Sequence, residues 1–360
     1  MMEDIANALA REAAVSVTCL PDGSVDRRYA VEDAAGDVET RRDLGRRIAA
    51  GHAKSFRVEH EGTAPGGQAV NAARQLHALG ATTTLYGHLG HAVFDGLPFA
   101  AHSMGRPADV AVFEFDDDAV MFTEESSAIA DWDLDDLDAV AGGDPFDADA
   151  VVWTNWASTG NGTAALRALA ERDRAAEDGT ADEGATRGRD RRWLVVDPGD
   201  VTACERDAVG PFLDALAALD PFDVALSIND DELAFLADSI DGGTDAARGS
   251  VAGTDVRAAR LEFVRERGSL DLAVVHAADA AVARDASGTT RCPNLTVDAR
   301  RYTGGGDRFS AGLAYALAAD WTLGEALTLA NACATFYVSH AETAGTERLA
   351  AWLAERDAGV

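Results

Sequence analysis

The sequence predicts an α/β fold with a central, mostly parallel sheet flanked by helices on both faces, and a small second β-sheet. Three observations support this. Short apolar runs alternate with helical patterns along most of the 360 residues, a few segments alternate apolar and polar residues, and 47% of the residues are apolar. That apolar content can fill one large core, so we expect a single domain over residues 1–360.

The elements of the central sheet are expected in alternating order. The helix at 307–319 has the clearest pattern, because apolar residues recur at i, i+4, i+7 and i+8 from Phe309. The expected strands are residues 15–20, 83–87, 150–154, 193–196, 224–228 and 270–275, and the other expected helices are 67–79 and 162–171.

The second sheet is expected from residues 28–32, 55–61 and 110–115, with 121–124 extending the last strand. Their apolar and polar residues alternate as in half-solvated strands, so we place insertions at about 27–62 and 108–125. Such a sheet over a site would act as a lid. Residues 174–191 and 241–255 lack apolar periodicity and are expected to be surface loops.

The charge is strongly acidic. The chain has 62 acidic and 31 basic residues, a net charge of -31, and Lys54 is its one lysine. Disordered acidic proteins are poor in apolar residues, which this chain is not. At about 1 M salt the Debye length is about 3 Å, so a carboxylate-covered surface is tolerated there. We therefore predict a halophilic, haloarchaeal-type protein, as against an ordinary acidic one, and no binding to nucleic acid.

No run of 18 apolar residues predicts a membrane span, and the acidic N-terminus has no basic n-region of a secretory signal. The cysteines Cys19, Cys204, Cys292 and Cys333 show no CxxC spacing, which disfavours a metal site or a disulfide scaffold. These observations favour a cytoplasmic protein without a membrane partner or a metal-ligating cluster.

A glycine-rich loop precedes the helix at 307–319. It reads Thr303, Gly304, Gly305, Gly306, Asp307. Glycines let the backbone approach a ligand, and the free N–H groups of a first helical turn favour an anion. Asp307 has two explanations, a functional carboxylate or an ordinary helix cap.

A second glycine pair, Gly66 and Gly67, stands before the helix at 67–79, with Asn71 in its first turns. The glycines would let the backbone reach sugar hydroxyls, to which Asn71 offers a donor and acceptors. The alternative is a glycine turn leading into an amphipathic helix.

Both segments resemble signatures of the ribokinase-like (PfkB) carbohydrate kinases. TGGGDRFSAGLAYAL is similar to the C-terminal pattern DTxGAGDxFxxG, and GGQAVN to the N-terminal pattern GGxxxN. The resemblance covers roughly residues 13–345 and implies a single kinase domain of ribokinase-like fold. It implies that Asp307 is the catalytic base and that the amides of Gly304, Gly305 and Gly306 form an anion hole.

The resemblance extends to other site residues. It implies that Asp26 binds substrate hydroxyls with Gly66, Gly67 and Asn71, although Asp26 could be an exposed turn residue. Asn229 and Glu232 match the family's NxxE motif, which influences Mg2+ and phosphate binding. The resemblance also implies that Thr303 contacts the nucleotide. Asn229 and Glu232 also fit a capping box.

The chain departs from the family at Arg301, where the usual Asp helps to form a monovalent-cation site. Cation activation is therefore open, and Arg301 could contact a phosphate instead. Residues 276–281 replace a glycine-bearing turn beside the nucleotide, which leaves the donor preference open. Together with Lys54 and Arg57, Arg301 could bind a substrate that already bears a phosphate.

The expected function is ATP- and Mg2+-dependent phosphorylation of a sugar or nucleoside hydroxyl. The alternatives are a sugar-phosphate kinase on the same scaffold and a non-catalytic sugar-binding protein. A nicotinamide-dependent dehydrogenase would need GxGxxG after the first strand, where the sequence is TCLPDGSVD. The edges of the second sheet could pair with a second copy, so a homodimer through the lid is possible.

Overall fold

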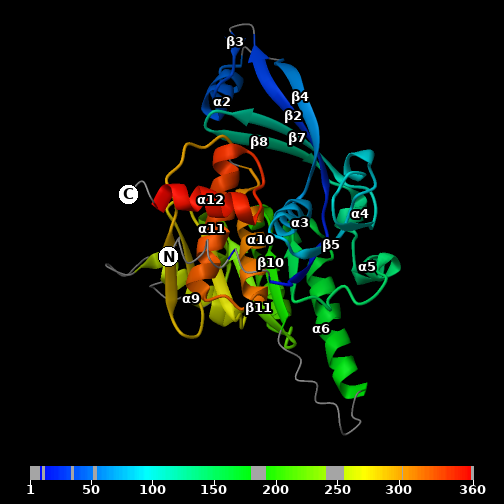
Figure 1. Ribbon diagram of the computed structural model, residues 1–360. Coiled ribbons are helices and arrows are strands. Elements are labelled where there is room, and N and C mark those ends of the chain that lie inside the picture. Colours follow the sequence, from blue (N-terminus) through cyan, green and yellow to red (C-terminus); the bar gives the residue numbers. More distant parts are fainter. Residues whose placement is uncertain are drawn as a thin grey trace.

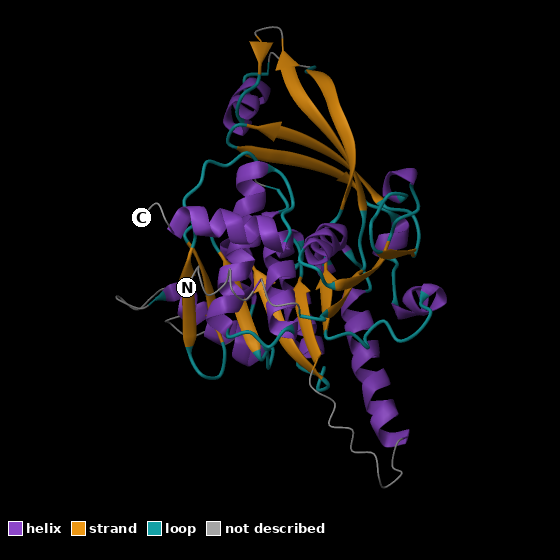
Figure 2. Ribbon diagram, in the orientation of Figure 1, coloured by secondary structure: helices purple, strands orange, loops and turns teal. Residues whose placement is uncertain are grey.

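Two sheets of different size make up the molecule in the computed structural model (Figure 1, Figure 2). The structure describes residue 9 and residues 13–33, 36–51, 55–179, 192–240, 255–301 and 303–357. In the view of Figure 1 the small sheet rises above the larger one, and helices surround the larger sheet.

The large sheet has nine strands in the order β14-β13-β12-β11-β10-β9-β1-β5-β6. All neighbours pair in parallel except β12 with β13 and β13 with β14, which confirms the predicted, mostly parallel sheet. The strands are β1 (Ser16–Leu20), β5 (Thr82–Gly87), β6 (Ala100–Ser103), β9 (Ala150–Thr154), β10 (Arg192–Asp197), β11 (Phe222–Ile228), β12 (Leu272–His276), β13 (Ala280–Arg284) and β14 (Thr289–Pro293).

Helices cover both faces of this sheet because its strands are apolar on both sides. In β9, Val152 belongs to one buried cluster, while Val151 and Trp153 belong to the other. The first cluster is completed by α3 (Gln68–Ala78), α10 (Gly305–Ala318), α11 (Leu323–His340) and α12 (Thr346–Asp357). The second is completed by α5 (Leu134–Val140), α6 (Gly162–Gly179), α7 (Val209–Leu216), α8 (Asp230–Ser239) and α9 (Val256–Arg267).

The small sheet is centred on a strand that begins shortly after β1. Strand β2 pairs in parallel with β7 and antiparallel with β4 and β3, and β7 pairs with β8. The strands are β2 (Ser24–Asp33), β3 (Gly36–Asp37), β4 (Arg57–Gly66), β7 (Ala108–Phe115) and β8 (Asp118–Glu124), and α2 (Arg41–Ala49) lies beside β8. These strands occupy the segments in which the second sheet was expected.

Some elements differ from the sequence-based expectation. Residues 174–179 are not loop but the last turns of α6, and α10 begins two residues before Asp307. The rest of that expected loop, Lys54, and nearly all of 241–255 lie outside the described residues. Helix α11 was not predicted, because it is buried around most of its circumference and so lacks an amphipathic stripe. None of the described helices has the length and apolar character that crossing a membrane requires.

Candidate active site

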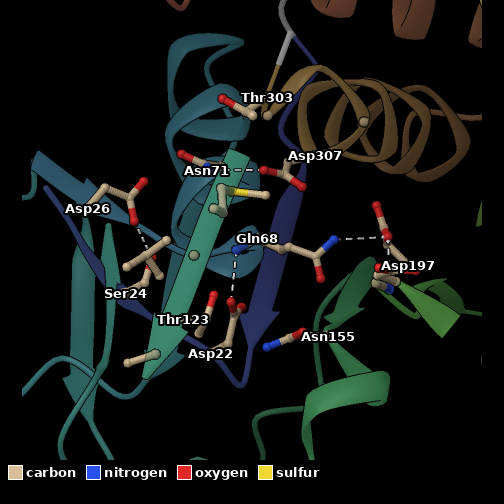
Figure 3. Close-up of a pocket in the computed structure, with 18 of the residues that line it drawn as sticks. Asp22, Ser24, Asp26, Gln68, Asn71, Thr123, Asn155, Asp197, Thr303 and Asp307 are labelled. Atoms are coloured by element: carbon tan, nitrogen blue, oxygen red, sulfur yellow. Dashed lines mark hydrogen bonds between the residues drawn. The ribbon is translucent and has the colours of Figure 1, made fainter. Parts of the chain in front are cut away.

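A cavity of about 790 Å³ lies between the two sheets, where β1, β10, β11 and β12 end. In open α/β sheets, ligands bind at the carboxyl ends of the strands. Nine of the predicted site residues line it, and Figure 3 shows several of them pointing into the same space. They are Asp26, Gly67, Asn71, Asn229, Glu232, Thr303, Gly304, Gly306 and Asp307; Gly66 and Gly305 are not in the lining.

The glycine loop forms the start of α10. Gly304 is the N-cap in the left-handed region, with φ 86°, and the helix begins at Gly305. A Cβ on Gly304 would lie 2.7 Å from an Arg308 nitrogen, and one on Gly306 would lie 3.1 Å from the ring of His276. Only glycine fits this loop without displacing those side chains. The first N–H groups of α10 have no partner within the helix, so this end of the cavity suits an anion.

Asp307 is buried beside that helix start, with 7% of its surface exposed. Its Oδ2 accepts a hydrogen bond of 2.8 Å from Nδ2 of Asn71 (Figure 3). Burial, followed by the charge of Asp197, raises the pKa of Asp307 to about 7, although Arg308 and the Asn71 hydrogen bond oppose the rise. A carboxylate with this pKa can accept a proton near neutral pH. A carboxylate that only caps a helix does not need a raised pKa.

Asp22, two residues after β1, is a site residue that sequence reasoning missed. Its carboxylate accepts hydrogen bonds from the backbone N–H groups of Gln68 (2.8 Å) and Ala69 (2.7 Å), so it caps α3 from a distant strand. A Cβ on Gly67, whose φ is 99°, would lie 2.9 Å from an Asp22 oxygen. The signal in the sequence was its place two residues after the first predicted strand.

Asp26 and Gly66 fit together in a similar way. The Ser24 hydroxyl donates a 2.6 Å hydrogen bond to Asp26 Oδ1, and a Cβ on Gly66 would lie 2.1 Å from Asp26 Oδ2. Burial raises the pKa of Asp26. Gly66 therefore makes room for a carboxylate, while Asp26 itself faces the cavity.

Asn229 and Glu232 form the capping box at the start of α8. The Asn229 side chain accepts from the N–H groups of Asp231 and Glu232, both at 2.9 Å, and Glu232 Oε2 accepts from the Asn229 N–H at 2.8 Å. Burial, together with the nearby charge of Asp197, raises the pKa of Glu232 to about 8. This carboxylate would therefore be stabilised by a cation.

These residues fit a Mg2+ ion that takes most of its ligands from phosphates and water rather than from the protein. No group of three His, Cys, Asp or Glu side chains that could hold a metal occurs in the described ranges. Mg2+ at phosphate sites commonly binds one or two carboxylates and completes its shell with phosphates and water. Glu232 at the cavity wall meets that requirement.

Asp197, at the end of β10, connects α3 and α10 through hydrogen bonds. Its Oδ2 accepts a 2.8 Å hydrogen bond from the Ser310 hydroxyl on α10, and its Oδ1 accepts from Gln68 Nε2 at 3.2 Å. Burial raises its pKa to about 6. The same cavity also exposes four arginines, Arg28, Arg74, Arg301 and Arg308, of which sequence reasoning noted Arg301.

Comparisons with known proteins agree with this geometry. No curated protein matches the sequence. The family model described as prokaryotic ketohexokinase matches residues 188–355, which contain the glycine loop and the Asn229–Glu232 segment. Over these residues the sequence resembles that family of sugar kinases, and the whole fold resembles that of ribokinase-like (PfkB) kinases. Its resemblance to that family is thus confirmed, and the haloarchaeal type stays a prediction.

Solved structures of ribokinase-like kinases share the fold of this chain at low sequence identity. The nucleoside kinase of Methanocaldococcus jannaschii is 14% identical, with a TM-score of 0.62 over 95% of this chain and 100% of that chain. Escherichia coli phosphofructokinase-2, in complex with substrates and products, is 16% identical, with 0.60 over 95% and 100%. Xylella fastidiosa fructokinase with bound ATP is 12% identical, with 0.63 over 95% and 99%. These likenesses establish the fold.

Proposed function

We propose that this kinase transfers the γ-phosphoryl group of ATP to a hydroxyl of a sugar or nucleoside, with Asp307 as the base. The observation that supports it best is the buried Asp307 carboxylate, with a pKa of about 7, beside the free N–H groups of α10 in a cavity between two sheets. The ketohexokinase family model and the fructokinase fold favour a ketohexose skeleton. Because a nucleoside kinase shares this fold, nucleosides are also candidate acceptors.

The reaction moves one proton and breaks one bond. The acceptor hydroxyl oxygen attacks the γ-phosphorus while its proton passes to an oxygen of Asp307. The bond between the γ-phosphorus and the bridging oxygen breaks, and its electron pair stays on ADP. The N–H groups of Gly304, Gly305 and Gly306 stabilise the charge on the transferred group. Asp26, Gly67 and Asn71, which line the cavity, hold the acceptor.

Thr303, Asn229 and Glu232 are proposed to serve the nucleotide. Glu232 would hold Mg2+, which neutralises phosphate charge when it is bound. Glu232 lines the same cavity as Asp307 and has a pKa raised by burial and by Asp197, so a cation there relieves an unfavourable charge.

The small sheet is proposed to close over this site as a lid within a single domain of residues 1–360. Its strands carry Arg28, Val110, Val112 and Met121 into the cavity wall. Exposed apolar side chains on its edge strands could be covered by a second copy in a homodimer; they are Val58 on β4 and Met121 and Phe122 on β8. A cytoplasmic, high-salt setting is proposed from the charge of -31.

The test is phosphoryl transfer from Mg-ATP in molar KCl to a panel of sugars, nucleosides and sugar phosphates. We expect turnover of one class of acceptor and its loss in Asp307→Asn. Turnover that survives this substitution would refute the role of Asp307. Binding of a sugar without any turnover would favour the non-catalytic alternative. The sugar-phosphate alternative is supported by a structural observation, the four arginines that line the cavity.

A further inference from the structure

Four arginines from distant parts of the chain meet in the cavity. Arg28 is on β2, Arg74 on α3, Arg308 on α10, and Arg301 precedes the glycine loop. We call these four residues the arginine cluster. In a chain with 62 acidic and 31 basic residues, a wall of four cations requires a physical reason.

The members of the cluster have few counter-charges. Glu114 on β7 is shared, at 3.1 Å from Arg301 Nε and 3.6 Å from Arg28 Nε. Arg74 has no carboxylate within 4.0 Å among the ion pairs of the described residues, and its distant partner is Asp26. Arginines on the surface are better paired. Two examples are Arg172, 2.6 Å from Asp138, and Arg257, 2.7 Å from Asp230.

Arg308 is the most deeply placed member. It is 3% exposed, its guanidinium stacks 3.8 Å from the centre of the Tyr337 ring, and one of its nitrogens donates to Gly304 O at 3.0 Å. Its carboxylate neighbour, Asp307, is 3.8 Å away. The Nε atoms of Arg308 and Arg28 are buried without a hydrogen-bond partner. A ligand cannot reach these enclosed Nε atoms, but an anion in the cavity would compensate the buried charge of both guanidinium groups.

The electrostatics indicates the same need. Burial lowers the pKa of Arg308 and of Arg74. Tyr337 and Asp307 oppose the shift of Arg308, and the charges of Arg74 and Arg301 add to it, whereas for Arg301 burial is outweighed by Tyr337 and Glu114, which raise its pKa. Arginines held close together repel one another, and this repulsion persists in salt because the site is buried. An anion among them removes it.

The position of the cluster indicates which ligand supplies that anion. Arg28 comes from the small sheet, and Arg301 is joined to the small sheet through Glu114. The proposed nucleotide residue Glu232 instead lies near Asp197, and both are carboxylates. The arginine cluster thus lies next to the small sheet, together with the carboxylate of Asp26, whereas the cavity wall at the ends of β10 and β11 carries Asp197 and Glu232 and, among the described residues, no arginine.

We infer that the acceptor itself carries an anionic group, a phosphate ester or a carboxylate, which the arginine cluster binds while the reacting hydroxyl faces Asp307. The inference rests on the proposed function and names its substrate class. The two N–H groups of a guanidinium fork donate parallel hydrogen bonds to the two oxygens of either anion. A neutral sugar has no such pair of charged acceptor oxygens.

The experiment compares matched acceptors in molar KCl with Mg-ATP: fructose with its 1- and 6-phosphates, ribose with ribose 5-phosphate, and sorbitol with gluconate. We expect kcat/KM to be at least about 100-fold higher for one anionic acceptor than for its neutral counterpart, as expected for charge-assisted hydrogen bonds. The phosphorylated sugars and gluconate distinguish a phosphate from a carboxylate.

Arg74→Met tests the cluster itself. We expect a loss of about 10- to 100-fold in kcat/KM for the anionic acceptor, mainly through its KM, and no change in the KM for ATP. Arg106→Met is the matched control, because Arg106 is an arginine of the small-sheet region whose side chain is 64% exposed and outside the cavity lining. If Arg74→Met does not fold, Arg301→Gln replaces it.

The outcomes separate the inference from the proposed function. Efficient turnover of neutral sugars alone would overturn the inference and leave the kinase proposal standing. An equal loss for neutral and anionic acceptors, or a raised KM for ATP, would also overturn it, because the cluster would then serve the nucleotide or the fold. If no acceptor turns over, the proposed function fails, and calorimetric binding of fructose 6-phosphate against fructose decides the inference.

Discussion

Replacing Asp307 by Asn should stabilise the protein while it abolishes activity. Burial and Asp197 raise the pKa of this carboxyl from 3.8 to about 7. At about 1.4 kcal/mol per pH unit, keeping the ionised group buried costs roughly 4 kcal/mol of folding free energy. Asn removes the charge and still accepts the hydrogen bond from Asn71. The side chain is thus held in an unfavourable state that its proposed role as base requires.

The sign and range of the effect follow from linkage. The pKa of Asp307 is higher in the folded protein than in the unfolded chain. The parent protein therefore has its full stability below pH 3.8 and loses part of it as the pH rises through about 7. We expect the advantage of Asp307→Asn in the free energy of unfolding to grow from about 2 kcal/mol at pH 5 to about 4 kcal/mol at pH 8.

Urea unfolding in molar KCl at several pH values measures this difference, and steady-state phosphoryl transfer measures the loss of activity. Asp147→Asn is the control, because its side chain is 83% exposed and should change stability little at any pH. A pH-independent difference, or an Asp307→Asn variant less stable than the parent at pH 8, would refute the electrostatic reasoning. The parent's kcat/KM should rise with pH through about 7 as Asp307 loses its proton.

Three further outcomes are expected. Gly66→Ala would put a methyl group 2.1 Å from an Asp26 oxygen, so kcat/KM for the acceptor should fall at least about tenfold with the KM for ATP unchanged, as steady-state kinetics would show. Gly312→Ala would press on the backbone of α11 at 2.9 Å and should cost about 1–3 kcal/mol in urea unfolding, whereas Gly324→Ala, with nothing within 4 Å, should not. Glu232→Gln should raise the free Mg2+ concentration needed for half-maximal rate, which titration with Mg2+ at fixed ATP measures; an unchanged requirement would remove Glu232 from the proposed metal site.

Much of the site could be predicted because its residues come in short local patterns. The glycine loop with Asp307 and the pair Gly66 and Gly67 are recognisable in the chain, and the structure places them beside one cavity. The α/β alternation likewise predicted the strands that surround it. Local backbone chemistry is encoded locally: a glycine with positive φ, as at Gly304, is a property of its own turn.

Other features depend on contacts between distant segments. Nothing in the sequence around Asp22 indicates that it caps α3, because its partners Gln68 and Ala69 lie 46 and 47 residues further on. Helix α11 was missed because a helix buried on most sides has no polar face to mark its period. The pKa of Asp307 depends on burial by the whole fold and on Asp197, which is 110 residues away in sequence (307 minus 197).

The sequence by itself therefore determined the fold class, the two glycine segments and the carboxylate that follows the second of them. Only the tertiary structure decided which carboxylates are buried, which helices they cap, and that four arginines share one wall of the cavity. The reason is physical: periodicity and turn chemistry act over a few neighbouring residues, whereas desolvation and charge repulsion are set by side chains that folding brings together from the whole chain.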